Sequence, residues 1–103
     1  MMASAIGTFE KQSYEEVNIT VDFSNRMATA ETISSSTVTV TGKGTSTDYS
    51  STMAGTPSVS GQTVICLIKA GTTGSSYNAS YRIVTSASQK FEADVVIKVQ
   101  DVT

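Results

Sequence analysis

Hydroxyl side chains are the most numerous potential nucleophiles in this sequence of 103 residues, which contains 16 serines and 16 threonines. A hydroxyl attacks a substrate only when a neighbouring base accepts its proton. The sequence contains no histidine, and none of its five lysines follows a serine at the spacing of a Ser-x-x-Lys motif. Because no base accompanies any nucleophile, we expect a protein that is not an enzyme.

The acidic residues lack the spacing that acid–base or metal chemistry requires. Glu15 and Glu16 are adjacent, so on a strand their side chains point to opposite faces and cannot act as a pair. With one cysteine and no histidine, the chain has no zinc-binding pattern. We therefore expect no metal ion and no cofactor. Five further carboxylates are far apart in sequence and form no calcium loop: Asp22, Glu31, Asp48, Asp94 and Asp101.

Composition also limits the classes of binding partner. The net charge is -2 and the seven Lys and Arg residues are scattered along the chain, which argues against nucleic-acid binding. The longest apolar run, residues 64–68, is far shorter than the ~20 residues of a membrane helix, and residues 1–7 lack the pattern of a signal peptide. Cys66 lies between Ile65 and Leu67 and is predicted to be a buried thiol.

Apolar and polar residues alternate over several short segments, and this period of two predicts that strands position these side chains. In residues 15–23, for example, Val17, Ile19 and Val21 share one face. We expect a short edge strand near Tyr49 within a long loop, and no helix. Strands are predicted at residues 15–23, 33–41, 58–60, 63–70, 77–85 and 90–99.

About six or seven short strands separated by turn signals predict an all-β fold, an immunoglobulin-like β-sandwich of about seven antiparallel strands in two sheets. We expect this single domain to span residues 9–103, after a flexible N-terminal segment at residues 1–8. Tyr77 follows a glycine-containing turn. Immunoglobulin-like folds place a corner tyrosine at such a position, where its hydroxyl caps the turn, so Tyr77 is a candidate for this role. An aromatic residue at the rim of the sandwich is the alternative. The predicted core comprises Val17, Ile19, Val21, Phe23, Val38, Val40, Val64, Cys66, Ile68, Tyr81, Ile83, Phe91, Val95, Ile97 and Val99.

Two short motifs within this pattern carry a family resemblance. They are Asp22-Phe23-Ser24 and Ala70-Gly71-Thr72-x-Gly74-x-x-Tyr77. With the order of strands around them, the chain resembles small immunoglobulin-like structural proteins of tailed bacteriophages and prophages, described as fibre-tail adaptors or head-tail structural proteins.

The resemblance implies a virion component that is made in the bacterial cytoplasm. Its expected function is an assembly or adaptor module of the tail, fibre or head-tail region, and its expected partners are other virion proteins and copies of itself. An adhesion or glycan-binding immunoglobulin-like domain is the alternative. That function needs an exposed aromatic platform, for which Tyr14 and Tyr49 are the candidates.

Apolar residues on the outward positions of three late strands predict a protein interface. A solvated face should not collect such residues, so they indicate a contact surface if the strands share one sheet. Two basic residues interrupt this expected patch. The candidate interface residues are Ile65, Leu67, Arg82, Val84, Val96 and Lys98.

Overall fold

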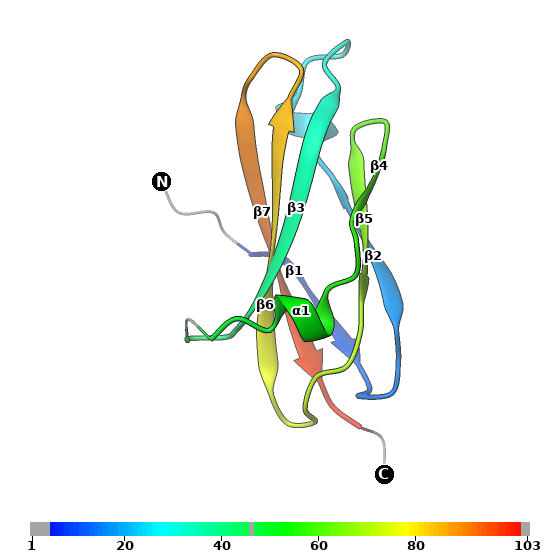
Figure 1. Ribbon diagram of the computed structural model, residues 1–103, viewed down its shortest axis with the longest axis vertical. Helices are drawn as coiled ribbons and strands as arrows, with labels where there is room; N and C mark the ends of the chain where they lie inside the picture. Colours follow the sequence, from blue (N-terminus) through cyan, green and yellow to red (C-terminus); the bar gives the residue numbers. More distant parts are fainter. Residues whose placement is uncertain (1–4, 46, 102–103) are drawn as a thin grey trace.

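The computed structural model describes residues 5–45 and 47–101, which form two β-sheets packed face to face (Figure 1). The strand order is β1-β7-β6-β3 in the four-stranded sheet and β2-β5-β4 in the three-stranded sheet. This arrangement confirms the predicted sandwich of seven strands in two sheets. The strands are β1 (Ala5–Lys11), β2 (Val17–Asp22), β3 (Ile33–Gly42), β4 (Ser58–Ser60), β5 (Thr63–Ile68), β6 (Ser76–Thr85) and β7 (Lys90–Val99).

Strand β1 corrects two expectations. It pairs with β7 in parallel, with Gly7 opposite Val95 and Lys11 opposite Val99, so the strands are not all antiparallel. Residues 5–8 therefore lie in a strand and not in a flexible segment, whereas residues 1–4 lie outside the described residues. The sequence of β1 contains glycine and small residues without a clear alternation, so its strand character depends on the backbone of β7 and not on a pattern of its own.

Two short helical turns correct the expectation of no helix, and the edge strand expected near Tyr49 is reduced to one antiparallel bridge, between Thr41 and Asp48. A 3-10 turn, η1 (Ser24–Arg26), follows β2, and one α-helical turn, α1 (Ser50–Met53), follows Tyr49. Asp48 starts this turn, because its Oδ1 accepts the backbone N–H of Ser50 at 2.8 Å. Over residues 5–45 and 47–101, no helix has the length and hydropathy of a membrane span.

The core matches the predicted alternation of the strands. Every predicted core residue is buried except Val17 and Phe91, which are half-buried and pack against the core. Met27 and Met53 also belong to the core, although neither lies in a strand. These flexible side chains fill the space that the strands leave open. The buried core also includes Tyr77, Ala79 and Ala93.

Tyr77 forms the predicted tyrosine corner. Its hydroxyl accepts the backbone N–H of Thr72 at 2.9 Å, and its ring meets that of Tyr49 edge-on with a centroid distance of 5.2 Å. Burial raises the pKa of Tyr77, but hydrogen bonds with Thr72 and Ser75 outweigh it, so the pKa lies below its ordinary value. Gly71 has a φ of 95°, and a Cβ there would lie 2.8 Å from Val99, so this turn requires glycine.

A second set of contacts fixes the two chain segments beside this corner. Lys11 is 3% exposed, and its ammonium donates to the carbonyls of Ala70 at 2.6 Å and Gln12 at 2.7 Å. Asp101 accepts the N–H and the hydroxyl of Ser13 at 2.7 and 2.9 Å. Burial lowers the pKa of Lys11, and the bonds from Ser13 lower the pKa of Asp101. These bonds hold the end of β1 and the chain after β7 together.

The opposite end of the sandwich is closed by the buried carboxylate of Glu31. It accepts the backbone N–H of Ala28 at 3.0 Å and the hydroxyl of Thr85 at the end of β6. The side-chain amide of Gln62 donates to the carbonyls of Ala28 and Glu31, both at 2.8 Å. This network fixes the loop between β2 and β3, which carries Arg26 toward the four-stranded sheet.

Candidate functional site

Four of the six predicted interface residues share one surface, the outer face of the four-stranded sheet. Arg82 and Val84 lie on β6, and Val96 and Lys98 lie on β7. They alternate with buried residues of the same strands, so their side chains point away from the other sheet. Val84 and Val96 are half-buried, whereas Arg82 and Lys98 are exposed. The two apolar side chains are not adjacent, because Val84 lies opposite Lys90 and Val96 lies opposite Asn78, with the Arg82–Glu92 pair and the Ser80–Asp94 pair between them.

The other two residues, Ile65 and Leu67, lie on the opposite outer face. They belong to β5, at the centre of the three-stranded sheet. The expectation that the three late strands share one sheet is therefore wrong. After β5 the chain crosses to the other sheet through residues 69–75, and an alternating pattern shows which face a residue takes but not which sheet its strand joins.

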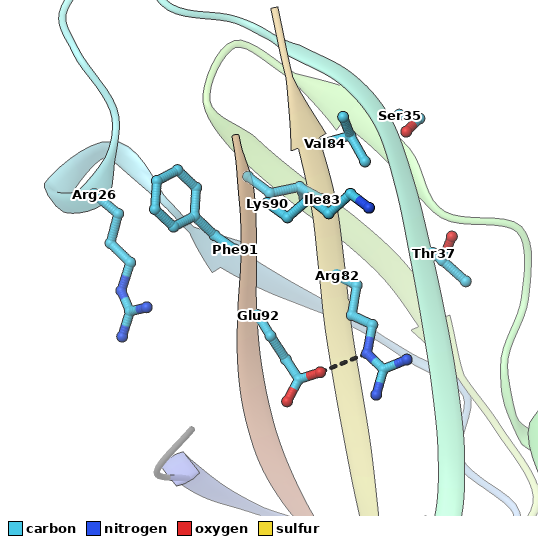
Figure 2. A pocket seen from close by; sticks show the side chains of 9 residues that line it. All are labelled: Arg26, Ser35, Thr37, Arg82, Ile83, Val84, Lys90, Phe91 and Glu92. Atoms are coloured by element: carbon cyan, nitrogen blue, oxygen red, sulfur yellow. Dashed lines mark hydrogen bonds and ion pairs between the residues drawn. The ribbon is translucent and has the colours of Figure 1, made fainter. Parts of the chain in front are cut away.

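A groove of about 630 Å³ lies at one end of the face that carries Arg82 and Val84 (Figure 2). Its walls come from β3, β6, β7 and the turn η1. Across the sheet, Ser35 is opposite Val84, and Thr37 is opposite Arg82. The groove is lined by Arg26, Ser35, Thr37, Arg82, Ile83, Val84, Lys90, Phe91 and Glu92.

The groove carries more positive than negative charge, although the whole chain has a net charge of -2. The guanidinium of Arg82 pairs with the carboxylate of Glu92, its cross-strand neighbour on β7. Arg26 and Lys90 add two further cations to the lining. Figure 2 shows Arg26 beside the ring of Phe91 and the Lys90 side chain extending over β6 toward β3. This arrangement suits contact with acidic groups.

Among these groove residues, only Arg82 and Val84 belong to the interface that the sequence pattern predicted. Arg26 comes from a turn far from β6 and β7 in sequence, and no pattern connected it with Arg82. The pairing of Arg82 with Glu92 depends on the register of the hairpin, which residue spacing alone did not supply. The alternation of Lys90 and Glu92 around Phe91 was the available signal for two outward residues on one strand.

The two tyrosines that were candidates for a carbohydrate platform lie in different environments. Tyr14 is 95% exposed in the loop between β1 and β2. Tyr49 is 37% exposed, and its ring packs against Tyr77. Tyr14 therefore presents a free ring surface, whereas part of Tyr49 serves the tyrosine corner.

In the part of the chain that the structure describes, no group of three or more His, Cys, Asp or Glu residues could hold a metal ion. Cys66 is a free, fully buried thiol, and burial raises its pKa. A thiol in this state is a poor nucleophile, so Cys66 serves packing.

Comparison with known proteins gives one family. Residues 11–98 match the family model described as "Podophage GP4 fiber-tail adaptor protein gp77". The match begins at the buried Lys11 and ends within β7, so it covers most of both sheets. The search of curated proteins finds no match.

Proposed function

The chain belongs to the family of the podophage GP4 fiber-tail adaptor protein gp77, and we propose that it joins a fibre to the tail as a structural adaptor. The match over residues 11–98 is the observation that carries this proposal. Such a module binds and positions its partners and carries out no catalysis. The absence of histidine, and of any lysine at Ser-x-x-Lys spacing, agrees with this role.

The outer face of the four-stranded sheet is the proposed contact surface. Val84 and Val96 supply apolar area there, and Arg82 and Lys98 supply charge. Glu92 and Asp94 lie on the same face, so it combines apolar side chains with charges of both signs, as the polar rim of a protein interface does. In the particle we expect several copies of the chain around the tail axis, as a ring or a trimer, because repeated identical contacts build closed assemblies.

A pair of matched variants tests this surface. Val84→Glu places a carboxylate on the proposed contact face, and Leu67→Glu places one at a half-buried outward position of the other sheet. Thermal unfolding checks that each variant folds, and mass spectrometry of purified particles measures how much chain each particle holds. We expect Val84→Glu to fold but to be lost from particles, and Leu67→Glu to be retained.

The outcomes test the contact surface and the adaptor function independently. If folded Val84→Glu is incorporated like the wild type, this face is not the contact surface. If the wild-type chain itself is absent from purified particles, the adaptor function is wrong.

The exposed ring of Tyr14 favours one alternative, an adhesion or glycan-binding domain. A glycan array with the wild-type chain and a Tyr14→Ala variant distinguishes the two functions. For an adaptor we expect no glycan signal. A signal that Tyr14→Ala abolishes would support the alternative.

A further inference from the structure

Strand β3 has one long side that no other strand covers. It is the last strand of the sheet β1-β7-β6-β3, so only one of its sides is paired, with β6 (Figure 1). An edge strand presents backbone N–H and C=O groups to solvent and can accept a further strand.

The chain itself covers the end of this edge nearest Gly42. Val40 donates its N–H to the Ser50 hydroxyl at 2.9 Å and accepts the N–H of Tyr49 at 2.7 Å. Gly42 donates its N–H to the carbonyl of Thr47 at 3.1 Å. The segment before α1 thus runs beside this part of β3 and forms one antiparallel bridge, between Thr41 and Asp48.

These bonds fix which backbone groups of β3 point outward. Because Val40 and Gly42 bond away from β6, and the register from Ser35 to Gly42 is regular, Ser36 and Val38 must point in the same direction. Residues 34–38 therefore form the uncovered part of the edge, which we call the open edge. It lies on the same side of β3 as the bonds that Val40 and Gly42 form with residues 47–50.

The open edge also lacks two usual protections against strand addition, charge and proline. Charged residues, proline, bulges or short length normally protect an edge; β3 has ten residues without any charge or proline, and its register shift lies at the end of the open edge, between Ile33 and Ser35. The other three edge strands differ. Strand β1 carries Glu10 and Lys11, β2 carries Asp22, and β4 has three residues. Strand β3 is thus the longest of the four edge strands and carries no charge or proline.

We propose that the open edge accepts an extended segment of a partner virion protein, which adds as a further strand beside β3 and carries an acidic side chain toward the groove. This inference rests on the adaptor function and names the way in which it binds. Ser35 and Thr37 line both the edge and the groove, so alternate side chains of an added strand face the side on which Lys90 extends.

A second copy of β3 fits this edge less well. In an antiparallel pair centred on Thr37, Ser34 of the second copy would lie opposite Val40, where Tyr49 and Ser50 already bond. A copy of the ten-residue strand would therefore meet the chain before α1. A short segment that ends beside Val38 avoids this contact.

Ser36→Pro tests the proposal most directly, because it removes an outward N–H that the sheet does not use. Proline is tolerated on the solvent side of an edge strand, so we expect the variant to fold. Ser36→Ala is the matched control, since it shortens the side chain but keeps the N–H. We expect about tenfold less Ser36→Pro than Ser36→Ala chain in purified particles, the effect of losing one buried hydrogen bond and its neighbours.

Hydrogen exchange gives an independent readout without any substitution. We expect the amides of Ser36 and Val38 to exchange at least about tenfold more slowly in purified particles than in the isolated chain. If Ser36→Pro fails to fold, Ser36→Lys replaces it, because an edge lysine opposes strand addition and leaves the backbone intact.

Equal incorporation of the folded edge variant and Ser36→Ala would overturn the proposal, as would unchanged exchange at Ser36 and Val38. Either result leaves the adaptor function intact, whereas absence of the wild-type chain from particles refutes the function itself. Sedimentation of the isolated chain tests the occupant. Self-association that Ser36→Pro abolishes would identify a second copy as the occupant and refute the partner segment.

Discussion

The tyrosine corner offers the sharpest test of how this small sandwich is held together. Tyr77→Phe removes one oxygen atom and keeps the ring, its burial and its edge-on packing against Tyr49. The perturbation is therefore confined to the hydrogen bonds of the hydroxyl, of which the best defined is the one that it accepts from the N–H of Thr72 at 2.9 Å, beside the interaction with Ser75.

The structure limits the expected loss of stability. A buried donor that loses its partner costs about 1–3 kcal/mol. Thr72 is exposed, so water can replace the lost acceptor in part, and the lower half of this range, about 1–2 kcal/mol, applies. In a domain of this size, each kcal/mol lowers the unfolding temperature by roughly 4–8 °C. We therefore expect Tyr77→Phe to unfold about 4–16 °C below the wild type.

Urea and thermal unfolding monitored by circular dichroism measure this difference. Tyr49→Phe is the matched control, because it removes the same atom from the partner ring, which is 37% exposed. We expect Tyr49→Phe to change the free energy of unfolding by less than about 0.5 kcal/mol. The reasoning is refuted if Tyr77→Phe is equally neutral, or if both variants lose the same stability.

Three further predictions concern the core, the thiol and acid stability. Ile19→Ala should lower the free energy of unfolding by about 2–5 kcal/mol in a urea titration, and Phe91→Ala should cost less, because Phe91 is half-buried. The thiol of Cys66 should react with a thiol reagent only in denaturant, and rapid labelling of the native chain would contradict its burial. The folded pKa of Asp101 lies below its ordinary value of 3.8, so its stabilising contribution is present above that pH and disappears as the pH falls through the folded pKa. Unfolding of wild type and Asp101→Asn between pH 7 and pH 2 should therefore show a difference that vanishes at the acid end.

Local pattern was sufficient to predict most of the strands. In β7, large apolar residues alternate with polar ones, and burial of one face follows directly from that period of two. Strand β1 was missed because its hydrogen bonds depend on β7, more than eighty residues away in sequence. The helical turn α1 was missed because it has four residues, and the bond that the N–H of Ser50 donates to Asp48 lies within a segment rich in turn-forming residues.

The candidate surface was predictable only in part, and the reason is topological. Val84 and Leu67 have the same alternating environment in sequence, yet they lie on opposite faces of the sandwich. The connection through residues 69–75 decides this, and no property of either side chain encodes it. The groove likewise depends on Arg26, which the Glu31 network places near β7.

Because its side chains are mostly neutral hydroxyls, the open edge can be hydrated and can still accept a further strand. Lysine or proline would keep a free edge soluble, but each would also block the strand that the edge is proposed to accept. Ser34, Ser36 and Thr37 instead offer hydroxyls that hydrate the edge and compete for its backbone groups without closing it. The hydroxyl of Ser34 bonds the carbonyl of Val84 on β6 at 2.9 Å, so this bond lies on the paired side of β3 and does not occupy the open edge. An edge that is hydrated by neutral hydroxyls still yields to a partner strand that supplies backbone hydrogen bonds.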